Sequence, residues 1–433
     1  MNAAASAAAP APVAASAGLS FSQLGFALLV PLVAFAQLDA VANRLSAMLP
    51  IGLYGALYFA CGACAAAAWL GDRGTRLAGT PAPGVRLALA LLLWACISMA
   101  LSEHPGEGWD YVQNMVKAIG LLGLAALLVD TPRRLNILLG AVAVAGILCA
   151  LIVFAEVATA QRIFSTSVAA VTAEYGGVPR SAGGSDENPT TAAHMLLVST
   201  AILVGLFVAR RGLRPLAGLA LALCGAALAL MAARSALIGL GVAVLLALYA
   251  LRRERIFPLA LLGLAGLAAA VLLLVPSLID RFTAILDWGR DPTLFRRTTY
   301  LAVGFDLFGR SPIWGIGPGN FPLFYAGDEY RFMPGRQPVL RELHNTYLDA
   351  AVELGLIGLT LFLAAAASAV AAARAALASP ALRPAALALL FALAALLVAS
   401  IFMPNKDMRY LWLLFGLAFQ CGRLAVAERG RGA

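Results

Sequence analysis

The sequence predicts an all-α, polytopic membrane protein, and its composition and its length predict this together. Of the 433 residues, 62% are hydrophobic and only 12% are charged, whereas soluble domains are nearer half apolar and a quarter charged. A single globular core stops growing at about 250–300 residues, so the excess of apolar residues has to face lipid. We therefore expect about twelve transmembrane helices and a large, partly helical periplasmic loop before the helix that follows His344.

Twelve apolar runs approach the length of about 20 residues that crosses a bilayer. They lie at 22–40, 50–70, 85–101, 112–129, 135–157, 190–209, 214–231, 235–251, 256–276, 350–372, 384–402 and 409–425. The first nine occupy 21–276, with one periplasmic loop at about 158–189, and the last three occupy 350–425 after a second loop at 277–349. Residues 1–20 are rich in Ala, Pro and Ser and are expected to form a disordered tail. Residues 426–433 are expected to form a second tail.

The arginines predict the orientation of these spans. One set of inter-span segments is basic: it holds Arg73, Arg76, Arg133, Arg134, Arg210, Arg211, Arg214, Arg252, Arg253, Arg255, Arg374, Arg383, Arg423, Arg429 and Arg431. Cytoplasmic loops carry such an excess of basic residues, so both termini are expected in the cytoplasm and both long loops outside. The net charge of +9 is thus explained by topology, without nucleic acid. The six cysteines lie in apolar runs and are expected to be packing residues.

The strongest candidate site is the stretch 341–349, which runs into the span at 350–372. Polar groups at the edge of hydrocarbon are costly, so they are usually paired, snorkelling or functional. Arg341 would share a face with His344 if the helix has already begun there. Its charge would keep the imidazole neutral, which is the form that a general base needs. The alternative is an interfacial histidine that is bonded to a carbonyl.

Other arginines occur where the positive-inside rule does not require them. Arg180 lies in the first long loop, Arg296 and Arg297 lie in the second, and Arg234 separates two spans. Long loops are exempt from the rule, so solvated surface charge, or snorkelling of Arg234, would explain them. The sharper hypothesis is that several of them meet an anion.

A nucleotide or metal site is not expected. The run Gly315-x-Gly317-x-Gly319 lacks the Lys-Ser/Thr of a P-loop, so it is interpreted as a tight turn whose amides could lie near a phosphate. The chain has three histidines far apart in sequence and no Asp-x-Asp pair. We therefore expect no metal and no other cofactor.

Several motifs resemble those of one membrane-enzyme family. His344-Asn345, followed after nine residues by Gly355-Leu356-Ile357-Gly358, resembles the signature of the O-antigen ligases and the related O-antigen polymerases. The stretch 234–239 resembles their arginine motif. Other pieces resemble further recurring segments, namely 295–297, 312–321, and Arg180 with Asn188-Pro189. The resemblance covers roughly 175–415, and the first 150 residues match only in being hydrophobic spans.

The resemblance implies a GT-C-like glycosyltransferase of the Gram-negative inner membrane with a periplasmic active site. Such an enzyme transfers a glycan from undecaprenyl diphosphate, without metal and with inversion. As a ligase it would complete lipopolysaccharide by joining O-antigen to lipid A–core oligosaccharide, and its other partners would be membrane lipids. His344 would then be the base, and Arg234, Arg341 and Arg180 would hold the diphosphate or orient His344.

The other implied roles are less specific. Arg296 and Arg297 would bind the diphosphate or acceptor phosphates, and Asn345 and Tyr347 would contact substrate. The large loop and the Gly183-Gly184 segment would form a lid or wall above a lateral opening for the lipid.

Three alternatives to the ligase remain open. An O-antigen polymerase and a protein O-oligosaccharyltransferase would use the same lipid-linked donor with a different acceptor. A transporter or flippase belongs to another class and would need ionisable residues deep in the spans. The sequence offers only Lys117 and Glu156 near span ends, and the region of Arg234.

Overall fold

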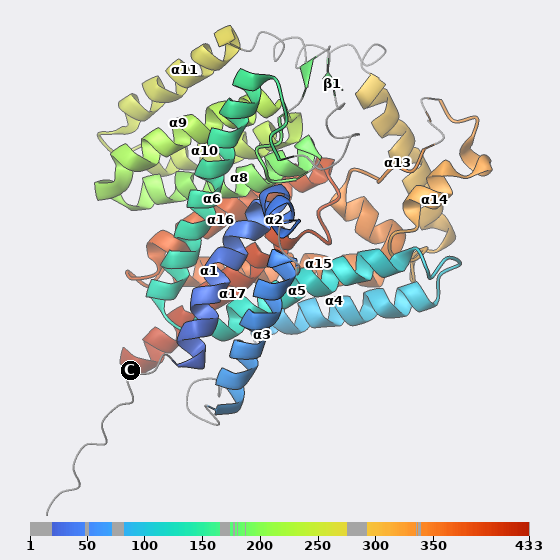
Figure 1. Ribbon diagram of the computed structural model, residues 1–433, viewed down its shortest axis with the longest axis horizontal. Helices are drawn as coiled ribbons and strands as arrows, with labels where there is room; N and C mark the ends of the chain where they lie inside the picture. The colour runs from blue at the N-terminus through green and yellow to red at the C-terminus, as the bar shows by residue number, and fades with distance from the viewer. Residues whose placement is uncertain are drawn as a thin grey trace, which may run out of the picture.

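The chain forms a bundle of α-helices with one short strand pair (Figure 1). The computed structural model describes residues 20–47, 52–71, 82–164, 174–175, 178–179, 181–186, 188–274, 292–334, 336 and 339–432. The elements are α1 (Phe21–Gln37), α2 (Asp39–Ser46), α3 (Leu53–Gly71), α4 (Pro83–Ala100), α5 (Gly108–Leu128), α6 (Pro132–Thr159), β1 (Glu174–Tyr175), β2 (Val178–Pro179), α8 (Pro189–Ala209), η1 (Arg211–Leu213), α9 (Arg214–Met231), α10 (Arg234–Leu251), α11 (Phe257–Leu274), α13 (Pro292–Arg310), α14 (Phe321–Ala326), η3 (Asp328–Tyr330), α15 (Thr346–Ala376), α16 (Arg383–Ala399), η4 (Ser400–Phe402) and α17 (Arg409–Gly432). β1 and β2 pair antiparallel.

The predicted all-α, polytopic membrane fold is confirmed, and each expected span coincides with a helix. Among the described residues, ten helices are long and apolar enough to cross a membrane. Helices α1 and α2 pass the same test only together, and they bend by 108° where they meet. The apolar part of α11, Phe257–Leu273, is shorter than the test requires. Length and composition thus support ten or eleven spans where the sequence predicted twelve.

The large loop before α15 is partly helical, as predicted. Helix α13 occupies the middle of this loop, and α14 and η3 follow it. In Figure 1, α13, α14 and β1 lie at one end of the bundle and the C-terminal end of α17 lies at the opposite end. Helix α17 continues to Gly432, through residues that the sequence assigned to a tail.

Helices α8, α16 and α17 form the interior of the bundle. More than half of the apolar window of each is buried, against 11% for α3 at the periphery. A Cβ added to Gly205 of α8 would lie 2.4 Å from the Cα of Ala388 in α16, so the two helices approach closely at small residues. Association of membrane helices depends on such close packing, because lipid supplies no hydrophobic driving force between them.

The Gly183-Gly184 segment is buried and hydrogen-bonded to two neighbouring helices. A carboxylate oxygen of Glu156 accepts hydrogen bonds from the backbone N–H groups of Ala182 and Gly183, at 2.9 and 3.0 Å. The carbonyl of Gly184 accepts from the amide of Val41 at 3.1 Å. Residues 181–185 are buried, and these bonds tie them to α6 and α2.

Helix α15 is broken at Gly355, and the glycine loop 315–319 is docked into the break. Gly355 has φ 68° and ψ −172°, a conformation that side-chain-bearing residues avoid. The amide of Leu356 donates to the carbonyl of Pro312 at 2.8 Å, and the amide of Gly317 donates to the carbonyl of Glu353 at 3.0 Å. The loop therefore supplies partners for backbone groups that the interrupted helix leaves unpaired.

Two glycines make this docking sterically feasible. A Cβ on Gly315 would lie 2.3 Å from the Glu353 carbonyl oxygen, and one on Gly355 would lie 2.1 Å from the Ile313 carbonyl oxygen. From the other side, the indole N–H of Trp94 donates to the carbonyl of Leu354 at 2.7 Å. The break is thus enclosed by the loop and by α4.

We expect Gly355→Ala to destabilise the protein. The left-handed backbone costs about 1–3 kcal/mol for a residue with a side chain, and the clash with the loop adds to it. The matched control is Gly309→Ala on α13, where an added Cβ meets nothing within 4 Å. Thermal unfolding in detergent should show a clearly lower Tm for Gly355→Ala and an equal or higher Tm for the control. Equal Tm values for the two variants would contradict the docked break.

Candidate functional site

His344 is the last residue before the cap of α15, and its backbone is strained. It has φ 55°, a left-handed conformation that is uncommon outside glycine. Asn345 follows as the N-cap, and its side-chain oxygen accepts from the amides of Tyr347 and Leu348 at 3.0 and 3.1 Å. Strained residues of this kind cluster at functional sites when the surrounding structure holds them in place.

The relation of Arg341 to His344 differs from the prediction. Helix α15 begins at Thr346, so the two side chains do not share a helical face, and that interpretation was wrong. Arg341 is exposed in the extended segment that precedes the helix. Its positive charge nevertheless acts on the His344 imidazole.

The surroundings of His344 favour a neutral imidazole. Burial lowers the pKa of His344 from 6.5 to about 4. Three positive charges act in the same direction, in decreasing order those of Arg297, Arg341 and Arg296. The ring centroid of Tyr300 lies 5.5 Å from that of the imidazole. Among the described residues, none offers a hydrogen-bond partner to the buried Nδ1 of His344.

A small hydrophobic cluster brings the arginines of α13 to His344. Val303 and Leu307 of α13 are fully buried in a cluster with Leu343, which directly precedes the histidine. Gly304 faces the same contact, since a Cβ there would lie 2.8 Å from Leu343. Because Arg296 and Arg297 come from the first half of this helix, packing of α13 on the start of α15 fixes their approach to the imidazole.

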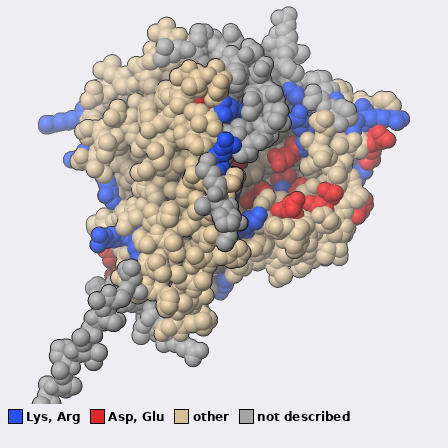
Figure 2. All heavy atoms as spheres, in the orientation of Figure 1, with Lys and Arg blue, Asp and Glu red and all other residues tan. Residues whose placement is uncertain are grey.

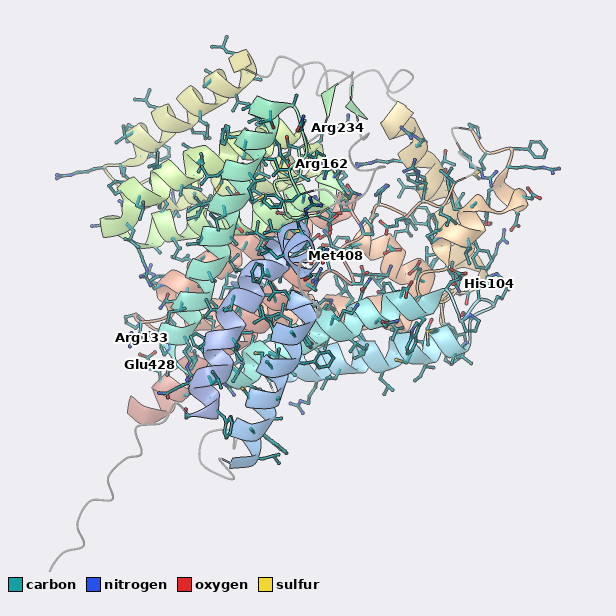
Figure 3. All side chains as sticks on the ribbon, viewed as in Figure 1. His104, Arg133, Arg162, Arg234, Met408 and Glu428 are labelled. Carbon is teal, nitrogen blue, oxygen red and sulfur yellow. The ribbon has the colours of Figure 1, made fainter. Side chains whose placement is uncertain are left out.

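Arg234 occupies the first position of α10, after a left-handed turn at Ala232. Figure 3 places it at the end of the bundle opposite Arg133 and Glu428, and well apart from His104. Its neighbour Ser235 bonds to His194, whose other nitrogen meets Asn405. Asn405 in turn bonds to Thr346. The structure thus links Arg234 to the His344 segment through a buried chain.

His194 and Asn405 were missed by sequence reasoning, although one of them had a signal. His194 lies inside the predicted span 190–209 and is fully buried. A polar, titratable residue within a membrane helix is a functional-site hypothesis by default, and that alone could have drawn attention to it. Asn405 lies in a short loop between α16 and α17 and had no comparable signal.

The remaining predicted site residues have other tasks or lie outside the described residues. The hydroxyl of Tyr347 donates to the carbonyl of Leu397 at 2.7 Å, and its ring packs against Phe362 with centroids 6.2 Å apart. The side-chain oxygen of Asn345 is engaged in the helix cap. Arg180 lies outside the described residues.

The glycine loop binds a carboxylate, whereas the sequence suggested a phosphate. The amides of Gly319 and Phe321 donate to the carboxylate of Glu353 at 2.8 and 3.2 Å. Lys406 Nζ lies 2.9 Å from the same carboxylate and also pairs with Asp349. These groups are buried, so the interaction is protected from water and from salt screening.

Acidic side chains gather in a concave part of the face that Figure 2 shows. In the segment of His344, desolvation raises the pKa of the Glu342 carboxyl to about 7, and the charge of Asp407 raises it further, while Lys406 opposes the shift. Glu342 nevertheless keeps accessible surface. Among the described residues, no group of three or more His, Cys, Asp or Glu side chains is arranged to hold a metal ion.

A largely apolar groove lies along α15. It has a volume of about 590 Å³, and α16 contributes Leu397 to its lining. It is lined by Tyr347, Leu363, Ala366, Ala367, Val370, Ala371, Arg374 and Leu397. A long hydrocarbon chain would find apolar contacts along this groove.

The family comparison agrees with the resemblance inferred from the motifs. The model of the family described as O-antigen ligase (Wzy_C) matches residues 219–363, a range that includes Arg234, Arg296, Arg297, Arg341 and His344. No curated protein matches the chain. Over this range the chain is similar to the O-antigen ligase family.

We expect His344 to stay neutral down to about pH 5, because its pKa lies near 4. Titration of histidine side chains by ¹⁵N NMR measures this directly. Arg297→Gln should raise the pKa of His344, because among the neighbouring positive charges that of Arg297 lowers this pKa the most. The control is Arg310→Gln on the same helix, because Arg310 pairs with Asp306 and Glu329. A midpoint near 6.5 in the unmodified protein would contradict the described environment.

Proposed function

We propose that this chain, which carries the O-antigen ligase domain at residues 219–363, transfers O-antigen from undecaprenyl diphosphate to lipid A–core oligosaccharide. The observation that carries the proposal is the His344 imidazole, which burial and the charges of three arginines keep neutral, directly before the cap of α15. A ligase or polymerase type of activity is supported by the family match. The acceptor and the residue roles are our proposal.

The reaction requires a base and a stabilised leaving group. In the proposed step His344 Nδ1 or Nε2 takes the proton of an acceptor hydroxyl, whose oxygen attacks the anomeric carbon of the donor sugar. The bond from that carbon to the diphosphate breaks, and undecaprenyl diphosphate leaves with the electron pair. Attack from the opposite face inverts the anomeric centre. General-base assistance of this kind contributes about 10²–10⁴-fold to a rate.

The arginines are suited to the diphosphate. Guanidinium groups bind phosphate oxygens in a bidentate manner and never deprotonate near neutral pH. We assign Arg297, Arg296 and Arg341 to this task because their charges already act on His344. We also assign Arg234, because hydrogen bonds connect its neighbour Ser235 to the start of α15. Such fixed charges stabilise the negative charge that develops on the leaving group, and we expect no metal requirement.

The surroundings of the site also support a lipid-linked donor. The groove along α15 is lined by Tyr347, three residues after the candidate base, and by apolar residues farther along the helix, and we propose that the polyprenyl chain lies there. We place this end of the bundle in the periplasm and both termini in the cytoplasm. Positive residues such as Arg133 at the opposite end (Figure 3) support that orientation.

The reconstituted reaction tests the proposal. Purified protein, lipid-linked O-antigen and lipid A–core are mixed in detergent with EDTA, and ligated lipopolysaccharide is resolved on a gel. We expect a ladder. Lengthening of the lipid-linked glycan alone would replace the ligase by a polymerase, and absence of both products would overturn glycan transfer to these acceptors.

His344→Ala should reduce the transfer rate by about 10²–10⁴-fold, because it removes the general base. His104→Ala is the matched control: the His104 ring lies 5.8 Å from the ring of Phe324 and has no role in the proposed step. Initial rates at saturating donor give the comparison. Near-normal turnover by His344→Ala would exclude this residue as the base.

A further inference from the structure

A chain of buried hydrogen bonds joins the starts of α10 and α15. Ser235 Oγ lies 2.9 Å from His194 Nε2, and Asn405 Nδ2 lies 3.4 Å from His194 Nδ1. The backbone N–H of Asn405 donates to Thr346 Oγ1 at 2.8 Å. Ser235 is 4% exposed and the other three residues are fully buried. The chain therefore connects three separate membrane helices and a loop in the interior of the protein.

Groups at the edge of the chain determine the direction of each bond. Ser400 Oγ donates to a backbone carbonyl of α16 at 2.8 Å, so it accepts from Asn405 Nδ2 at the same distance. Tyr410 donates its hydroxyl proton to Asn405 Oδ1 at 2.5 Å. With the amide held in this orientation, Asn405 Nδ2 also faces His194 Nδ1 as a donor. A neutral His194 then carries its proton on Nε2 and donates it to Ser235 Oγ.

The two ends of the chain lie next to candidate site residues. Ser235 directly follows Arg234 at the first turn of α10. At the other end, Thr346 is the first residue of α15 and is separated from His344 only by the capping residue. Thr346 also donates to the carbonyl of Met403 at 2.5 Å, so this end is anchored twice.

We propose that His194 and Asn405 are positioning residues for the transfer reaction. They hold Arg234, at the start of α10, and His344, just before α15, at a fixed separation. The proposal rests on the proposed function. A buried polar chain in a low-dielectric interior is rigid when every member is satisfied. Such rigidity matters because a displacement of about 1 Å at a reacting group costs about 100-fold in rate.

The first test removes one hydroxyl at each of two buried serines. Ser235→Ala breaks the link between His194 and α10, and we expect transfer to fall about 5- to 50-fold from one lost bond and the resulting displacement. Ser199→Ala is the matched control. The hydroxyl of Ser199 is also buried, on α8, and has no hydrogen-bond partner among the described residues. Equal transfer by the two variants, at equal Tm, would overturn the proposal.

A double-mutant cycle separates positioning from general destabilisation. If Ser235 acts through His194, Ser235→Ala should change transfer less than twofold in a His194→Leu background. Independent structural effects would instead multiply. Multiplicative losses in the cycle would overturn the proposed link.

The bond directions have a readout that does not depend on activity. The chain has three histidines, so the ¹⁵N signals of His194 are assigned by their loss in His194→Leu. We expect a proton on Nε2 and none on Nδ1, and a changed pattern in Asn405→Leu. A proton on Nδ1 would overturn the network itself. Absence of transfer by the unmodified protein would overturn the proposed function and the positioning role with it, while the NMR result still decides the hydrogen bonds.

Discussion

The docking of the glycine loop onto Glu353 is the contact on which the end of the bundle with α13 and α14 depends. The backbone carbonyl and the carboxylate of this one residue accept the amides of Gly317, Gly319 and Phe321. Lys406 neutralises the carboxylate from the other side. Removing one member of such a buried group leaves an uncompensated charge, which costs about 3–5 kcal/mol. The docked loop leads into α14, whose first residue, Phe321, packs in the cluster that holds α13 against α15.

The charges of Arg297, Arg341 and Arg296 act on the His344 ring. Its neighbour Glu342 is instead influenced by the carboxylates of Asp407, Glu353 and Asp186, and by Lys406. In the reaction that we propose, the arginine charges attract the donor diphosphate, and the neutral imidazole accepts the proton of the acceptor hydroxyl.

Local sequence patterns were sufficient to predict the helices and to select His344 as a candidate. They were insufficient to predict contacts between residues far apart in the sequence. Apolar runs located every membrane helix, because a run that lies in lipid has to form its backbone hydrogen bonds within itself, as a helix does. The apolar pattern placed the start of this span at residue 350, whereas the Asn345 cap begins α15 at Thr346. The pairing of Lys406 with Glu353 joins residues far apart in sequence, and no periodicity indicates it. His194 was visible as a polar residue in a span, but its partner Asn405 was not.

The central claim is a division of labour in which arginines hold the diphosphate and His344 moves the proton. Equilibrium binding of undecaprenyl diphosphate to purified variants in detergent tests it most directly. Binding should weaken at least about tenfold in Arg297→Gln, because a charged hydrogen bond is lost. His344→Ala and the α13 control Arg310→Gln should bind within about twofold of the unmodified protein. Weakened binding in His344→Ala with unchanged binding in Arg297→Gln would contradict the account.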